Sequence, residues 1–212
     1  MMILPQSGTA TSFSIEKSTT YSYTDTNKNS IYSRTWKNVV QADGVRKGLR
    51  ISVPTDKSKW ITNDFKADKG FATYLQSTVW HDYTWFIVDD AGNPVDWTGY
   101  LAVWDLDSIG KLCVPNECLI EYVGQGKKIK NPVAAPDYSG YTQFQGKDSY
   151  TSSTRESDVL DYGISLRLHI PASGMVMHVK GTSSTDHEKI WFGMLTPIIE
   201  QNQFPSNPGK WE

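Results

Sequence analysis

The residues best suited to chemistry are carboxylates that gather near the middle of the chain. Five aspartates fall within residues 89–107, namely Asp89, Asp90, Asp96, Asp105 and Asp107. Ca²⁺ binds six to eight oxygen atoms from carboxylates, amide carbonyls and the backbone. Asp89, Asp90, Asn93 and Asp96 could supply several of these ligands, with Asp105 and Asp107 nearby, although the spacing is not that of an EF-hand. The alternative is an ordinary turn, because Asp and Asn are common turn formers.

Acid–base catalysis would need two positioned carboxylates or a histidine with a partner. The four histidines are scattered along the chain, at His81, His169, His178 and His187. His169 and His178 alternate with apolar residues, so both are predicted to lie on solvent-facing sides of strands. The chain has no G-x-S-x-G, H-E-x-x-H or glycine-rich phosphate loop. We therefore expect no catalytic centre.

A cluster of tryptophans offers a second kind of chemistry. Trp80, Trp85, Trp97 and Trp104 lie close together in the sequence. A flat indole can stack on the apolar face of a sugar ring while neighbouring polar groups bind its hydroxyls. The sequence therefore predicts a ligand site near Trp80, His81, Asp82 and Trp97. The alternative is packing in the core, and an alternating strand would point Trp80 and Trp85 in opposite directions.

The two cysteines, Cys113 and Cys118, are separated by Val-Pro-Asn-Glu. Pro-Asn favours a turn that could bring the sulfurs together, so a disulfide and two free thiols are both open. A disulfide would close a small ring and contribute about 2 kcal/mol or less. A metal site is not expected, because no second cysteine pair or histidine cluster accompanies them.

A period-two hydrophobic pattern runs through most of the chain and must position these residues. Its clearest instance is residues 164–170, ISLRLHI, and residues 49–53 and 175–179 repeat it. This spacing places one side of a β-strand in a core and the other in water. The pattern predicts an all-β fold, a β-sandwich with long loops and little helix.

The expected organisation is one large domain, because 212 residues suit a single all-β unit. Residues 1–10 read as a leader or linker, residues 11–200 as the domain, and residues 201–212 as a C-terminal linker. A strand at 79–89 is predicted to pair with one at 100–106 across the turn at 90–94. Residues 60–76 are ambiguous between strand and short helix. Residues 124–154 are predicted to form the longest loop, which could cover the ligand site.

Composition excludes several classes of protein. The formal net charge is −2, and the basic run Lys127-Lys128-Ile129-Lys130 is too short to indicate nucleic-acid binding. No apolar stretch is long enough to cross a bilayer, so membrane insertion is not expected. The first residues lack the features of a signal peptide. We therefore expect a piece of a longer protein, or a protein without an export signal.

Several segments, in the same order, resemble the antigen I/II family of Gram-positive surface adhesins, including its C-terminal repeats and the related glucan-binding lectin-like modules. Residues 83–96, YTWFIVDDAGNPVD, are similar to that family's aromatic strand and its D-x-x-G-N-P-I-D turn. Residues 101–108 resemble the strand that ends in S-L-N. Residues 23–25 and 30–34 resemble the opening strand and turn, and residues 191–193, WFG, resemble W-Y-G.

The resemblance implies a secreted, cell-surface or cell-wall domain with an immunoglobulin-like or lectin-like sandwich. Such a domain would be a monomeric part of a larger protein and would bind a host glycoprotein, a glycan or another surface polymer. The family's internal isopeptide bonds imply Lys17 or Lys37 and Asn202 as candidates for such a cross-link. Two other classes stay open: a phage receptor-binding or baseplate module, and a β-sandwich enzyme that processes glycans.

Overall fold

The computed structural model describes residues 19–24, 30–42, 45–54, 71–75, 79–104, 106, 110–148, 161–181 and 188–195. The predicted leader at 1–10 and linker at 201–212 lie outside these residues. So do Lys17, Asp105, Asp107, His187 and Asn202. The fold and the site are built below from the described residues alone.

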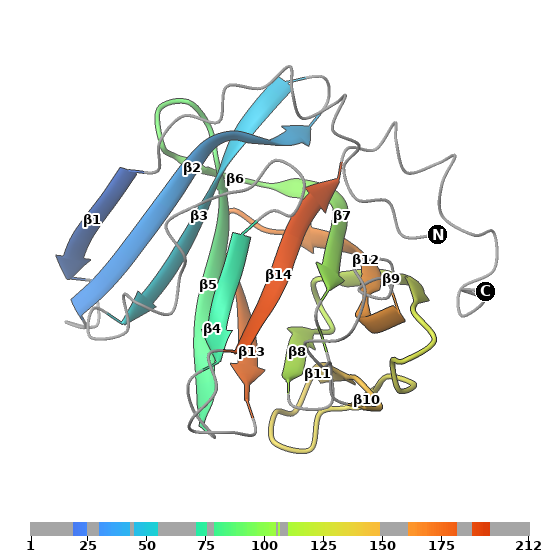
Figure 1. Ribbon diagram of the computed structural model, residues 1–212. Helices are drawn as coiled ribbons and strands as arrows, with labels where there is room; N and C mark the ends of the chain where they lie inside the picture. The colour runs from blue at the N-terminus through green and yellow to red at the C-terminus, as the bar shows by residue number, and fades with distance from the viewer. Residues whose placement is uncertain are drawn as a thin grey trace.

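The strands form two antiparallel sheets, which we name the large and the small sheet (Figure 1). In spatial order, the large sheet contains β1 (Thr19–Thr24), β2 (Ser30–Ala42), β3 (Val45–Pro54), β5 (Trp80–Val88), β13 (Met175–Lys180), β8 (Lys111–Pro115), β11 (Tyr141–Gln145) and β10 (Val133–Ala134), with β6 (Pro94–Val95) beside β5. The small sheet contains β4 (Phe71–Leu75), β14 (Glu188–Leu195), β7 (Trp97–Trp104), β12 (Ile164–Ile170) and β9 (Leu119–Gln125). The described residues contain no α-helix, which confirms the predicted all-β fold.

The two sheets pack face to face around one hydrophobic core. Figure 1 shows β4 and β14 of the small sheet lying over β5, while β1 to β3 extend to one side. Trp85 on β5 meets Phe192 on β14 edge to face, with ring centroids 5.2 Å apart. Leu166 and Leu168 on β12 are fully buried in the same cluster. This arrangement is sandwich-like, as the alternating pattern predicts.

Strand β5 shows how the period of two sorts its side chains. Tyr83, Trp85 and Ile87 are buried in the core. Trp80 and Asp82, which alternate with them, lie on the outer face of the large sheet and are partly or largely exposed. The prediction that Trp80 and Trp85 point in opposite directions is therefore confirmed.

The predicted pairing of residues 79–89 with 100–106 is wrong. β5 pairs with β3, β13 and the short β6, whereas β7 pairs with β12 and β14 in the small sheet. The chain turns tightly after β5, adds only Pro94–Val95 beside it, and then crosses between the layers at Asp96. The crossing lets Trp97, Leu101 and Val103 reach the core from the opposite side.

Two other segments contain more strand than the sequence predicts. The expected loop at 124–154 holds β10 and β11, and β11 pairs with β8 inside the large sheet. The ambiguous segment at 60–76 contains β4, paired with β14, while residues 60–70 lie outside the described part. Short strands among Gly, Pro and polar residues give a weak periodic signal, which explains both differences.

Candidate functional site

Four neighbouring strands place one row of side chains on the outer face of the large sheet. Asp82 on β5 lies opposite His178 on β13, and His178 lies opposite Cys113 on β8. Cys113 in turn lies opposite Gln143 on β11. Residues directly opposite one another in an antiparallel sheet project from the same face. The register therefore brings together residues that are far apart in sequence.

The centre of this row is the pair formed by His178 and Asp82. His178 Nδ1 lies 2.6 Å from Asp82 Oδ1, so the imidazole N–H donates to the carboxylate. The His178 side chain is only 9% exposed, whereas the Asp82 side chain is 60% exposed. A carboxylate that holds one imidazole nitrogen fixes the orientation of the ring.

Aromatic rings from the β10–β11 loop and from β11 cover His178. Tyr138 stacks on the imidazole with centroids 3.6 Å apart and planes 3° from parallel. Tyr141 lies 4.8 Å from the same ring at an angle of 50°. The stack explains why the predicted surface position of His178 is wrong: Tyr138 shields a strand face that would otherwise be open to solvent.

Trp80 extends this cluster along β5. Its indole meets Tyr138 edge to face at 5.1 Å, and Trp80 Nε1 donates to Asp137 Oδ2 at 3.0 Å. Lys180 Nζ lies 5.6 Å from the Trp80 ring centroid, in a cation–π contact. We call this surface the aromatic face, and its members are Trp80, Asp82, Asp137, Tyr138, Tyr141 and His178.

The tyrosine hydroxyls of the aromatic face stay protonated at neutral pH. Burial, and then the nearby Asp82 carboxylate, raises the pKa of Tyr138 to about 12. Burial, and then Glu117, also raises the pKa of Tyr141. The face therefore combines half-buried rings with neutral hydroxyls and the exposed carboxylates of Asp82 and Asp137. These groups suit the stacking and hydrogen bonding that bind polar, ring-shaped ligands.

The structure keeps two of the four predicted ligand residues on this surface. Trp80 and Asp82 belong to the aromatic face, but His81 and Trp97 are 1% and 2% exposed. Their prediction as surface ligand residues is wrong. His81 alternates with Trp80 and so points inward, and Trp97 begins a strand of the other sheet. The Trp97 ring covers Gly99 so closely that a Cβ there would lie 2.1 Å from Trp97 Cζ2.

Residues 89–93 form a hydrogen-bonded turn, and the predicted ligands do not converge on a cation site. Asp89 Oδ1 accepts from Asn93 N at 2.8 Å, and Asp89 Oδ2 accepts from Asn93 Nδ2 at 3.3 Å. This backbone hydrogen bond is the main reason why the pKa of Asp89 is lowered. Asp96 instead accepts from Ala172 N, and Asp90 is exposed. Within the described ranges, no three His, Cys, Asp or Glu side chains lie where they could hold a metal ion.

Of the two alternatives that the sequence leaves open, the structure has the two free thiols: Cys113 and Cys118 are unpaired with each other and buried. Cys118 packs in the core between the sheets. Cys113 shares its side of β8 with the row of Asp82 and His178, whereas its neighbours Leu112 and Val114 face the core. The Pro-Asn turn is present, but the sulfurs lie on different sides of the sheet.

Lys37 does not meet the chemical requirement of the predicted isopeptide bond. That reaction needs a lysine kept neutral by an apolar core. The Lys37 side chain is exposed and lines a surface pocket. Lys17 and Asn202 lie outside the described residues, so their part in the prediction is untested.

The sequence did not indicate four members of the aromatic face, which are Asp137, Tyr138, Tyr141 and His178. Asp137 and Tyr138 come from a segment without period-two alternation, which was expected to form a loop. Their contacts depend on the order of β5, β13, β8 and β11 in the sheet. The one available signal was the position of His178 and Asp82 on the polar sides of their strands.

Comparison of the chain with protein-family models, with curated proteins and with solved structures finds no match. Among the described residues, no helix is long and apolar enough to cross a membrane. The geometry of the aromatic face is therefore the basis for a functional proposal.

Proposed function

We propose that this protein is a non-catalytic binding domain of the adhesin type, which recognises a glycan of a host glycoprotein or of another surface polymer through the aromatic face. In this proposal the domain works outside the cell or at the cell wall. The single observation that carries it is the set of half-buried rings, Trp80, Tyr138 and Tyr141, arranged around the His178–Asp82 pair.

The arrangement supports binding because its polar groups are already held in place. Asp82 is fixed by His178, and Asp137 is fixed by Trp80 Nε1. A site whose side chains are ordered before the ligand arrives loses less conformational entropy on binding. The remaining acceptor positions of these exposed carboxylates are suited to sugar hydroxyls.

The same groups give little support to hydrolysis. Glycoside hydrolases of the usual kind use one carboxyl group as a general acid and a second as base or nucleophile. Here Asp82 is engaged by an imidazole and Asp137 by an indole N–H, and these contacts orient both carboxylates for recognition.

The test is a glycan array followed by titration of the best binder by isothermal calorimetry. Trp80→Ala should weaken binding by about ten-fold or more, because a central aromatic contact is commonly worth at least 1.4 kcal/mol. Tyr100→Ala is the matched control: Tyr100 is partly exposed on the small sheet and contacts Arg167. Its affinity should equal that of the unmodified protein.

Melting temperatures of both variants separate a binding defect from unfolding. If no glycan binds, or if Trp80→Ala and Tyr100→Ala change affinity equally, the proposed site is refuted. Release of reducing sugar from an array hit would replace the non-catalytic proposal with an enzymatic one.

A further inference from the structure

A buried positive charge lies on the inner face of the large sheet, away from the aromatic face. Arg34 on β2 is 5% exposed and lies opposite Ile51 of β3, which is fully buried in the core. Trp36, two residues further along the same side of β2, is also part of the core. A guanidinium keeps its charge when it is buried. A charge in such apolar surroundings is costly unless a partner compensates it.

Most of the hydrogen-bonding capacity of Arg34 is unused. Arg34 Nη2 donates to the Tyr32 hydroxyl at 2.6 Å, and the guanidinium carbon lies 5.8 Å from the centroid of the same ring. Arg34 Nε and Nη1 are buried and have no hydrogen-bond partner among the described residues. None of the described carboxylates forms an ion pair with Arg34, and β1, β2 and β3 contain no Asp or Glu. The contacts with Tyr32 therefore leave the charge of Arg34 uncompensated.

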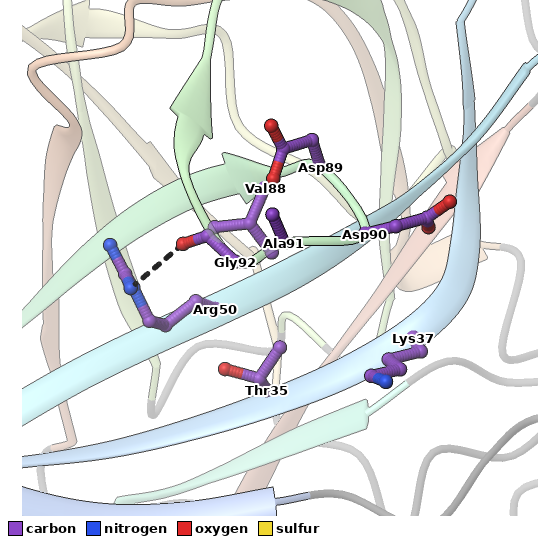
Figure 2. Close-up of a pocket in the computed structure, with 8 residues that line it drawn as sticks. All are labelled: Thr35, Lys37, Arg50, Val88, Asp89, Asp90, Ala91 and Gly92. Carbon is purple, nitrogen blue, oxygen red and sulfur yellow. Dashed lines mark hydrogen bonds between the residues drawn. The ribbon is translucent and has the colours of Figure 1, made fainter.

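The opposite face of β2 has a different balance of charge. Figure 2 shows the pocket on that face, where Lys37 and Arg50 share the lining with Asp89 and Asp90. The carboxylates of this pocket match its cations in number. Arg34 alternates with the residues that line the pocket and lies on the core side of the strand, so these carboxylates do not compensate its charge.

The unused donors define the kind of ligand that Arg34 can hold. A carboxylate is planar, carries one negative charge and accepts hydrogen bonds on both oxygen atoms. One oxygen can accept from the Arg34 guanidinium while the other accepts from Tyr32, whose hydroxyl still has its own proton to donate. Phosphate or sulfate would bring a second negative charge beside a single guanidinium in apolar surroundings. The burial of Arg34 also restricts the ligand to a small ion.

We propose that Arg34 and Tyr32 bind one small monovalent carboxylate, of the size of formate or acetate, on the inner face of β2. The guanidinium and the tyrosine hydroxyl donate to the carboxylate, and its charge compensates that of Arg34. The site uses no residue of the aromatic face, so it is independent of the proposed function. The ligand stabilises the folded protein, because it binds the native state and not the unfolded chain.

The first test follows the Nε–H signal of Arg34 in the ¹⁵N-labelled protein during titration with sodium formate. Sodium chloride and sodium sulfate are parallel titrations. Formate should shift this signal to saturation, with a dissociation constant in the millimolar range, whereas chloride and sulfate should not saturate it over the same range. Arg34→Met assigns the signal by its loss. The Nε–H signal of Arg50, on the opposite face, is the internal control and should show no saturable shift.

The second test measures urea unfolding in formate and in chloride at equal ionic strength. Formate at about ten times its dissociation constant should lower the unfolding equilibrium constant of the unmodified protein about eleven-fold. Arg34→Met should abolish this effect. Tyr32→Phe should weaken formate binding by about ten-fold, the loss expected for a hydrogen bond to a charged group. Lys37→Met is the matched control, because it removes an exposed charge from the opposite face of the same strand, and it should keep the full effect.

Stability in buffer without carboxylate shows whether the guanidinium needs an added anion. There Arg34→Met should unfold at no lower urea concentration than the unmodified protein, because an apolar side chain replaces an uncompensated charge. A large loss of stability in this variant would mean that the protein itself or bound water already compensates the charge, and it would overturn the proposal.

The remaining outcomes also decide the matter. Formate that leaves the Arg34 signal unshifted, or that stabilises Arg34→Met as much as the unmodified protein, overturns the proposal. Chloride or sulfate that binds as tightly as formate overturns the carboxylate class. Glycan binding by Arg34→Met should equal that of the unmodified protein, so this proposal and the proposed function can fail separately.

Discussion

At the scale of single residues, Cys113 and Cys118 show how burial controls reactivity. Burial, and then Asp137, raises the pKa of Cys113 to about 12. Burial, and then Glu117, raises the pKa of Cys118 to about 11. Because the thiolate is the reactive form, neither cysteine is a nucleophile at neutral pH. The position of Cys113 beneath Tyr138 and His178 is thus one of packing.

The folded protein should therefore resist alkylation. Iodoacetamide at pH 8 is expected to leave the native protein unmodified and to add two carbamidomethyl groups in denaturant without reductant, as measured by intact mass spectrometry. The inaccessibility of both buried sulfurs adds to their raised pKa values. A protein two hydrogens lighter, unreactive in denaturant until reduced, would show that a disulfide forms after all.

At the scale of elements, one carboxylate ties together two places where the chain changes sheets. Asp96 lies where the chain leaves β6 for β7, and Ala172 lies where it leaves β12 for β13. Asp96 Oδ1 accepts from Ala172 N at 2.8 Å. His169 Nε2 is 4.0 Å from the same oxygen. Both connections pass from one layer of the sandwich to the other, so this contact joins the layers at one end.

Loss of this contact should reduce stability modestly. Asp96→Ala is expected to lower the free energy of unfolding by about 1 kcal/mol, the usual net value of one such hydrogen bond. Asp96→Asn keeps an acceptor oxygen and should cost less. Urea denaturation measures both, and Asp90→Ala, an exposed aspartate in the neighbouring turn, is the control. Equal stability of Asp96→Ala and Asp90→Ala would mean that the contact does not hold the two crossings.

The sequence predicts single strands better than it predicts their neighbours. Ile164–Ile170 and Met175–Lys180 match the expected ranges closely, because alternation is encoded in each strand alone. The contact between His178 and Asp82 joins residues 96 positions apart. It depends on β13 lying beside β5, and strand order is a property of the whole sheet. Thus only two of the six residues of the aromatic face, Trp80 and Asp82, could be predicted, and Tyr138, which covers His178, could not.

At the scale of the whole molecule, two cysteine thiols and two tyrosine hydroxyls make the free energy of unfolding depend on pH in the alkaline range. The pKa of Cys113, Cys118, Tyr122 and Tyr138 is raised in the folded protein, with burial as the main cause for each. The unfolded chain releases these protons near the ordinary values of 9.0 for Cys and 10.0 for Tyr. Above these values the unfolded state binds fewer protons than the native state, so stability falls as pH rises.

Stability should therefore be constant up to about pH 9 and should decline from there toward pH 12. Urea midpoints measured at steps from pH 7 to pH 11 test this expectation. In the double variant Cys113→Ala, Cys118→Ala, the decline should begin one pH unit later, where the tyrosines of the unfolded chain ionise. A midpoint that does not change between pH 8 and pH 11 would contradict the linkage.

Strand β5 also determines how the protein can change over generations. From Trp80 to Ile87, its even-numbered residues lie on the outer face of the large sheet, which carries the proposed ligand site, and its odd-numbered residues are buried. If the proposed function holds, point substitutions at Trp80 or Asp82 change the preference of the ligand site while the buried neighbours continue to encode the fold. Loss or gain of one codon within the strand would exchange the two sets, because a one-residue slip reverses every side chain. New specificities on this surface are thus accessible through base changes, whereas small insertions and deletions in β5 should be eliminated.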